Sequence, residues 1–348
     1  MSAVKHMQAP FPYFGGKSRI APIVWERLGN VPNYVEPFFG SGAMLLCRPT
    51  APKIETVNDI DGFVSNFWRA VQAEPDAVAE FADWPVNEND LHARHAWLVG
   101  RKDSLQARLE GDPGFYDAKV AGWWCWGMCC WIGSGFCSGQ GPWHVVDGRL
   151  IKAERGELGN AGRGINRKRV HLGDKGRGVN RQLVHLADAG LGVNWKTKQG
   201  GVYEWMRALA ERLRHVRVCC GDWARVCGDT PTIKQGLTGV FLDPPYSAEA
   251  GRDNNIYRCE DLDVAHAVRE WAIERGGNPK FRIALCGYDG EHNMPGGWHE
   301  HEWKTKGGYG SQGGQGSQGS LNAHRERIWF SPHCLNPVAN DLALEFAR

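Results

Sequence analysis

The stretch best suited to chemistry is Asp243-Pro244-Pro245-Tyr246, which follows the short apolar run Val240-Phe241-Leu242. The apolar run predicts a buried strand of an α/β sheet, and the prolines must end it because proline cannot continue a strand ladder. Asp243 then lies just beyond a strand's carboxyl end, where open α/β sheets bind ligands. Its carboxylate only accepts hydrogen bonds, and Tyr246 supplies a flat ring with a polar tip. Such a site suits a planar ring bearing an amino group, although a plain loop after a strand is the alternative.

A second candidate ligand site is the segment Glu36-Pro37-Phe38-Phe39-Gly40-Ser41-Gly42, between a predicted strand and an apolar helix. Its two glycines let the backbone approach a ligand closely, and the G-x-G spacing argues against an ordinary dinucleotide enzyme, which carries G-x-G-x-x-G. Residues 54–59 predict the next strand. It ends in Asp59, whose carboxylate is placed to bind a ribose diol. The alternative role is to cap a helix predicted over residues 61–71, and the two roles can coexist.

Two further segments carry candidate ligand-binding groups. Tyr13-Phe14-Gly15-Gly16-Lys17 precedes a helix predicted over residues 20–28, and a glycine turn at a helix start presents N–H groups to an anion. The alternative is a plain helix start, and the segment lacks the spacing of a Walker loop. Asp222 follows a strand predicted over residues 216–220 and is placed either to accept from an adenine amino group or to cap the next turn.

The remaining elements complete an α/β pattern. Helices are predicted over residues 90–109, 116–131, 202–213 and 262–275, and strands over residues 281–286 and 326–330. The polar segment 249–258 suits a loop that closes over a base, and the Gly/Gln/Ser-rich segment 307–320 predicts a flexible connection.

Composition narrows the class of protein. The 348 residues are 42% hydrophobic and 23% charged, without an apolar run long enough to span a membrane or a signal-peptide pattern, which predicts a cytoplasmic protein. Four of the eleven cysteines, at positions 125, 129, 130 and 137, lie among tryptophans without a paired C-x-x-C. This pattern favours apolar packing over zinc binding, so no metal is predicted.

A basic repeat lies in the middle of the chain. Residues 163–172 recur at 177–186, and between residues 149 and 198 there are twelve Lys or Arg against four Asp or Glu. Glycine in each unit and alternating apolar residues favour short strands and turns. Cations beside Gly, Asn and His suit phosphate contacts and base reading, with a solvated basic loop as the alternative. The candidate DNA contacts are Arg163, Arg167, Lys168, Arg169, Arg177 and Arg181.

Taken in order, these motifs resemble the Dam-type DNA adenine-N6 methyltransferase family, with Asp-Pro-Pro-Tyr as its catalytic tetrapeptide. The resemblance covers roughly residues 10–75 and 200–335, with Phe14 and Asp61 standing where the family often has Ala and Asn. It implies a Rossmann-like S-adenosylmethionine-dependent methyltransferase sheet with helices on both faces and an inserted target-recognition domain. The implied division is a catalytic domain of residues 1–75 and 200–348, and a recognition region of residues 76–199 with repeats over about 163–194.

The resemblance also implies residue roles. An adenine flipped out of double-stranded DNA would present its amino group to Asp243 and the Pro244 carbonyl, with its ring stacked on Tyr246. The implied catalytic residues are Asp243, Pro244, Pro245 and Tyr246, and the implied S-adenosyl-L-methionine contacts are Tyr13, Gly16, Lys17, Glu36, Phe39, Gly40, Gly42, Asp59, Asp222 and Asp243.

Several alternatives stay open at the level of sequence. Cytosine-N4 methylation uses the same geometry on another ring, and a non-catalytic DNA-binding protein could share the fold. RNA is a weaker alternative substrate, because no sheet that stacks single-stranded bases is evident. The sequence gives neither the recognition site nor the oligomeric state. It leaves open whether a restriction endonuclease accompanies the chain or whether it is an orphan or phage-type enzyme.

Overall fold

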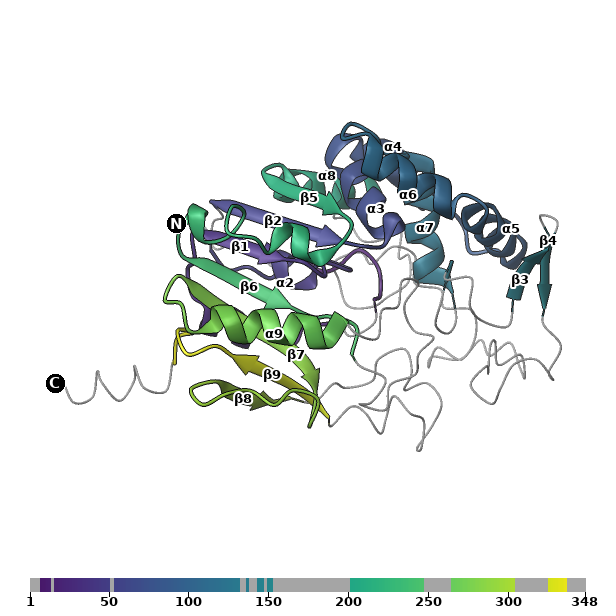
Figure 1. Cartoon of the computed structure of the whole chain (residues 1–348). Helices are drawn as coiled ribbons and strands as arrows, with labels where there is room; N and C mark the ends of the chain where they lie inside the picture. Colours follow the sequence, from purple (N-terminus) through teal and green to yellow (C-terminus); the bar gives the residue numbers. More distant parts are fainter. Residues whose placement is uncertain are drawn as a thin grey trace.

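The structure is a computed structural model that describes residues 7–13, 16–50, 53–131, 136–137, 143–146, 149–152, 201–246, 264–303 and 325–336. Its centre is a seven-stranded sheet with the order β5-β2-β1-β6-β7-β9-β8 (Figure 1). The strands are β1 Asn33–Glu36, β2 Ile54–Asp59, β5 Val216–Cys220, β6 Thr238–Leu242, β7 Phe281–Tyr288, β8 His299–Glu302 and β9 Glu326–Phe330.

The direction of the strands fixes where a ligand can bind. Strands β5, β2, β1, β6 and β7 are parallel, whereas β9 runs antiparallel to both β7 and β8. The chain passes from β1 outward to β2 and β5 on one side, and then returns to place β6 on the other side of β1. The strand order therefore reverses between β1 and β6, and ligands of open α/β sheets bind at the carboxyl ends of such a pair.

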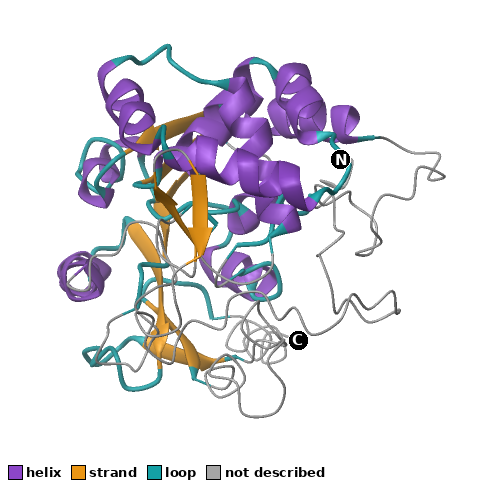
Figure 2. Ribbon diagram, turned by 90° about the vertical axis from the view of Figure 1, so that its right-hand side faces the viewer, coloured by secondary structure: helices purple, strands orange, loops and turns teal. Residues whose placement is uncertain are grey.

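Helices lie on both sides of the strands (Figure 2), which confirms the predicted fold class. The alternation of buried side chains along β7 explains this arrangement: Phe281, Ile283 and Leu285 join a core cluster with α9, while Ala284 and Cys286 face the larger cluster on the other side. The helices are α1 Ala21–Leu28, α2 Ala43–Leu46, α3 Gly62–Ala73, α4 Pro75–Ala82, α5 Glu88–Val99, α6 Lys102–Gly111, α7 Ala118–Cys130, α8 Val202–Leu213 and α9 Val264–Gly276.

Helices α4, α6 and α7 pack on α3 beside the sheet, α4 also packs on α8, and α5 packs on α7 (Figure 1). The aromatic helix α7 forms as predicted, and a Cβ on Gly122 would lie 2.6 Å from the Val78 carbonyl oxygen of α4, so the two helix backbones are in close contact. The four clustered cysteines are buried, as the apolar-packing interpretation predicts. Two short strands, β3 Trp143–Val146 and β4 Arg149–Lys152, follow as an antiparallel pair.

One helix prediction was wrong. The segment 90–109 forms two helices rather than one, because α5 ends at Val99 and α6 begins at Lys102. Glycine is a poor helix former, and the break at Gly100 lets Leu98 of α5 and Leu105 of α6 both reach the core.

The edge strand β8 was also missed from the sequence. Its residues, His-Glu-His-Glu, are mostly exposed at the edge of the sheet, so they lack the apolar alternation that predicts a strand. By contrast, α8, β5 and β9 have the predicted bounds, and β7 extends two residues further.

Some sequence predictions fall outside the described residues: the basic repeats at about 163–194, the polar segment 249–258 and the Gly/Gln/Ser-rich segment 307–320. The division into a catalytic domain and a recognition region stays a prediction. Within the described ranges, no helix is both long enough and apolar enough to cross a bilayer.

Candidate active site

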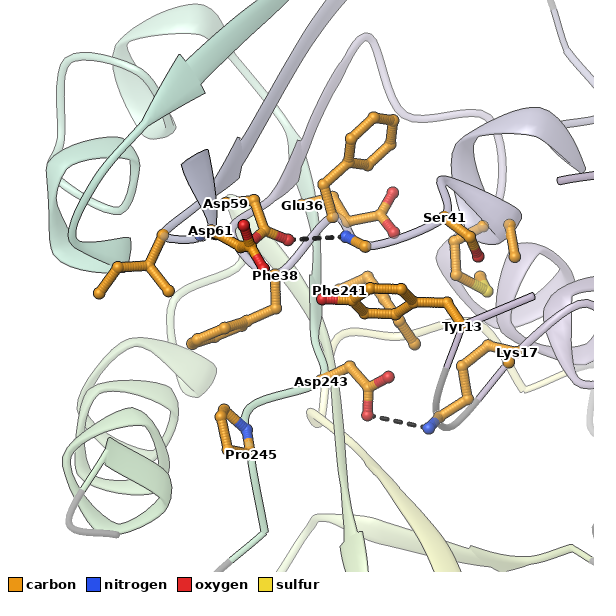
Figure 3. A pocket seen from close by; sticks show the side chains of 16 residues that line it. Tyr13, Lys17, Glu36, Phe38, Ser41, Asp59, Asp61, Phe241, Asp243 and Pro245 are labelled. Atoms are coloured by element: carbon orange, nitrogen blue, oxygen red, sulfur yellow. Dashed lines mark hydrogen bonds and ion pairs between the residues drawn. The ribbon is translucent and has the colours of Figure 1, made fainter. Parts of the chain in front are cut away.

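A pocket opens at the carboxyl ends of β1, β2 and β6, where the strand order reverses (Figure 3). It encloses about 670 Å³ of empty space, counting its open mouth. The lining residues are Tyr13, Gly16, Lys17, Glu36, Phe38, Phe39, Gly40, Ser41, Ala43, Met44, Asp59, Ile60, Asp61, Phe241, Asp243 and Pro245.

The turn between β1 and α2 forms one wall of the pocket. Gly40 and Gly42 have φ values of 47° and 70°, in the left-handed region that favours glycine. A Cβ on Gly40 would lie 2.7 Å from the Tyr13 ring, and one on Gly42 would lie 2.9 Å from the Phe39 ring. Trp68 holds the turn from behind, since its indole N–H donates to the Gly40 carbonyl at 2.9 Å. The two glycines therefore allow both the backbone shape and the aromatic packing.

Asp59 at the end of β2 is held by two backbone N–H groups. One of its oxygens accepts from Gly40 at 2.8 Å and the other from Asp61 at 2.8 Å, so Asp59 joins the end of β2 to the glycine turn. The helix-capping role considered for Asp59 is wrong. Helix α3 begins at Gly62, and its cap is Asp61, which accepts from the Phe63 N–H at 2.8 Å.

A buried polar cluster lies at the other end of the pocket. Lys17 is 4% exposed, and its ammonium lies 2.9 Å from Oδ1 of Asp243. The dashed line in Figure 3 marks this ion pair. The ammonium also donates to the Tyr246 hydroxyl at 3.1 Å. That hydroxyl lies 2.8 Å from Oε2 of Glu326, the first residue of β9. The cluster thus joins the segment before α1, the turn after β6 and the start of β9.

Burial shifts the proton affinities of two carboxyl groups in this region. Burial raises the pKa of Glu326, with Lys17 opposing the shift. Burial also raises the pKa of Glu36 well above its ordinary value, although the Tyr34 hydroxyl donates to it at 2.9 Å. Both glutamates therefore ionise less readily than an exposed glutamate.

The structure brings most of the sequence-predicted residues together. The pocket lining includes nine of the thirteen predicted catalytic and cofactor-binding residues: Asp243, Pro245, Tyr13, Gly16, Lys17, Glu36, Phe39, Gly40 and Asp59. Gly42, Pro244 and Tyr246 adjoin it without lining it, and Tyr246 packs edge-on against Tyr288 with 8% exposed. The six candidate DNA contacts lie outside the described residues.

Asp222 lies outside the pocket lining. It is exposed and accepts from the Ala224 N–H at 2.8 Å, which caps the short 3₁₀ helix η1 Trp223–Val226. The second 3₁₀ helix, η2 Ile233–Gln235, follows it before β6. Of the two roles predicted for Asp222, capping the next turn is therefore the one that a contact in the structure supports.

Sequence reasoning missed two residues of this region. Ile60 lines the pocket and is 47% exposed, unusual for a large apolar side chain, and its only sequence signal is its place directly after the strand-ending Asp59. Glu326 gives no signal at all, because a glutamate at the start of a strand looks like an ordinary surface residue.

Residues 13–95 match the family model of the D12 class N6 adenine-specific DNA methyltransferase. Over this segment, the chain is similar to that family. The matched segment contributes Tyr13, Lys17, the turn after β1 and Asp59 to the pocket. Asp243 lies beyond this segment and reaches the pocket through the parallel pairing of β6 with β1. No curated protein matches the chain.

Methyltransferases of the D12 class use S-adenosylmethionine, and their substrate is DNA. Among the residues that the structure describes, no group of three or more His, Cys, Asp or Glu side chains is arranged to hold a metal ion.

Proposed function

We propose that this methyltransferase methylates N6 of an adenine flipped out of double-stranded DNA, with Asp243 receiving the amino group. One observation carries the proposal. The Asp243 carboxylate lies at the carboxyl end of β6 and lines the same pocket as the glycine turn after β1 and Asp59, both of which belong to the segment that matches the family.

The first half of the pocket is proposed to bind S-adenosylmethionine, which supplies an electrophilic methyl group. Three features suit this cofactor: a glycine turn that a Cβ would fill, the Asp59 carboxylate for a ribose diol, and apolar walls for the rest of the molecule. The proposed contacts are Tyr13, Gly16, Lys17, Glu36, Phe39, Gly40, Gly42, Asp59 and Asp243. Asp222 is left out because its carboxylate caps η1.

The second half of the pocket is proposed to receive the adenine. A base inside the duplex is out of reach, so it must be flipped into the site. There Asp243 and the Pro244 carbonyl accept hydrogen bonds from the amino group and orient its lone pair. The amine becomes acidic only as it is alkylated, so Asp243 acts by position and charge rather than as a strong base.

Tyr246 is proposed to stack against the flipped base. Because 8% of this residue is exposed in the structure, stacking requires its ring to turn from Tyr288 toward the pocket.

The partner is proposed to be duplex DNA, contacted through the basic insert with its twelve cations against four acids. A cytoplasmic location in a bacterium or a phage-infected cell follows from this substrate.

The test is transfer of a labelled methyl group from S-adenosylmethionine to unmethylated duplex DNA, followed by nucleoside analysis. Asp243→Asn keeps the shape of the side chain but loses its charge, so kcat should fall by about 10²–10³-fold. The control is Asp229→Asn, which changes an exposed carboxylate paired with Arg275 and should leave the rate unchanged.

Label in N6-methyladenine from the wild type, lost with Asp243→Asn alone, is the expected result. Label in N4-methylcytosine would refute the adenine assignment. Absence of transfer from a folded protein that binds the cofactor would refute the proposed substrate.

A further inference from the structure

The polar cluster at the tetrapeptide contains one member that the methyl-transfer proposal does not use. Glu326 is 6% exposed, and its carboxylate reaches across from β9 to the Tyr246 hydroxyl at 2.8 Å. It also lies 3.9 Å from the Lys17 ammonium. Burying a carboxylate is costly unless it is paired and hydrogen-bonded, so its place beside the tetrapeptide calls for an explanation.

The hydrogen-bond capacity of Tyr246 supplies that explanation. A phenol has one proton to donate, and two carboxylates compete for it: Glu326 at 2.8 Å and Asp243 at 3.3 Å. Lys17 donates to the same phenol oxygen at 3.1 Å. The shorter contact indicates that Tyr246 donates to Glu326. The Asp243 carboxylate then keeps its ion pair with Lys17 but does not accept the tyrosine proton.

We propose that Glu326 is a positioning residue for methyl transfer, which accepts the Tyr246 proton and so keeps Asp243 available as an acceptor for the substrate amine. If Tyr246 donated to Asp243 instead, its proton would occupy an acceptor site that the amine needs. The inference rests on the proposed function, because it assigns a role within the same site.

The surroundings of Glu326 add a pH dependence. Its pKa is raised by burial, and a protonated Glu326 would donate to Tyr246 rather than accept from it. Tyr246 would then turn its proton to Asp243, so kcat should fall as the pH falls through the raised pKa of Glu326. The titratable or charged groups that face Glu326 are Lys17, Asp243, Tyr246, Cys286 and Glu291.

The experiment measures kcat on duplex DNA and the dissociation constant for S-adenosylmethionine in two variants. Glu326→Ala removes the acceptor and should lower kcat at least tenfold while cofactor affinity stays within about threefold. Glu326→Gln keeps an amide oxygen that accepts from Tyr246 at every pH, so it should recover most of the rate and lose the acid limb of the pH profile.

The matched control is Glu300→Ala on the neighbouring strand β8. Glu300 pairs with Arg327 at 3.0 Å and its side chain is 51% exposed, so its loss should leave kcat and the pH profile unchanged. A second arm combines Glu326→Ala with Tyr246→Phe. Tyr246→Phe removes the phenol proton for which Glu326 and Asp243 compete, so the loss of Glu326 should then have no further effect. The double variant should therefore be no slower than Tyr246→Phe alone.

The outcomes separate this inference from the proposed function. If the wild type is active, either of two results would overturn the positioning role and leave the proposed function intact. The first is a wild-type rate in Glu326→Ala, and the second is a rate in Glu326→Gln as low as that of Glu326→Ala. An inactive wild type would overturn both. If Glu326→Ala does not fold, the pH profile of Glu326→Gln decides, and an acid limb equal to that of the wild type would refute the role.

Discussion

At the scale of single residues, the pocket depends on a backbone conformation that residues with a side chain rarely adopt. Gly40 has a φ of 47°, and a Cβ there would meet the Tyr13 ring at 2.7 Å. Gly40→Ala adds about 1–2 kcal/mol of left-handed strain and displaces the ring. We expect the dissociation constant for S-adenosylmethionine, measured by calorimetry, to rise at least tenfold.

The control for this change is Gly228→Ala. A Cβ on Gly228 would meet nothing within 4 Å, and its φ lies outside the left-handed region, so cofactor affinity should stay at the wild-type value. An unchanged affinity in Gly40→Ala would show that the turn does not contact the cofactor.

The residues of the pocket differ in how far the sequence could predict them. Asp243, Asp59 and the glycine turn are predictable because each follows a recognisable apolar strand, and the carboxyl ends of parallel strands meet at one edge. Glu326 is not, because its partner Tyr246 is 80 positions away and the contact exists only through the pairing of β9 with β7. The inward position of the Tyr246 ring is likewise set by tertiary contacts, above all its packing on Tyr288.

At the scale of elements, the docking of α5 on the end of α7 should depend on pH. His95 of α5 is 3% exposed and stacks on Trp131 with ring centroids 4.8 Å apart. Burial, and to a lesser extent the nearby His92, lowers the pKa of His95 to about 4. Its ordinary value is about 6.5, so the unfolded chain binds a proton here that the folded chain does not.

The sign of the effect follows from this difference. The stabilisation that the folded state gains from keeping His95 neutral is fully present above pH 6.5 and is lost as the pH falls toward about 4. The free energy of unfolding should therefore fall with acidification by up to about 1.4 kcal/mol per pH unit from this group. Urea titrations at several pH values should give a shallower dependence for His95→Phe, which keeps an aromatic ring for the stack.

Replacement of the exposed His215 by Phe is the control for this measurement, and it should retain the dependence of the wild type. Equal slopes for His95→Phe and the wild type would show that His95 does not contribute to acid sensitivity.

The elements themselves were predictable where they bury an apolar face and unpredictable where they do not. Strand β6 and helix α8 carry strong periodic patterns, whereas β8 is an exposed edge with none. Gly100 is a weak local signal for the break between α5 and α6, because the burial of Leu98 and Leu105 on either side of it is set by tertiary packing.

At the scale of the whole molecule, charge is divided unevenly along the chain. The net charge is +2, but residues 149–198 carry +8, so the remaining residues together carry −6. A near-neutral protein can thus hold a strongly basic segment for a polyanion while the rest of its surface does not attract DNA. This division predicts that DNA affinity depends on the insert, whereas cofactor affinity depends on the pocket alone.

A charge-matched pair of triple variants tests this division. Replacing Arg167, Lys168 and Arg169 with Gln removes three cations of the repeat. Replacing Arg214, Lys234 and Lys280 removes three exposed cations that precede β5, β6 and β7, at the edge of the sheet opposite the pocket. Both variants lose the same net charge, so a difference between them reports position rather than total charge. The measurement is the DNA dissociation constant as a function of salt concentration.

Each phosphate contact contributes about 0.9 to the slope of log affinity against log salt, so losing three contacts should lower the slope by about 2.7. We expect this loss in the repeat variant only, with the affinity for S-adenosylmethionine unchanged in both. Equal slopes in the two variants would mean that the repeats contact no phosphates, and the basic insert would then be a solvated loop whose charge serves another purpose. A lower slope in the repeat variant would instead show that recognition and catalysis occupy separate parts of the chain, because the pocket draws on residues 13–61 and 241–245 and none of the repeat.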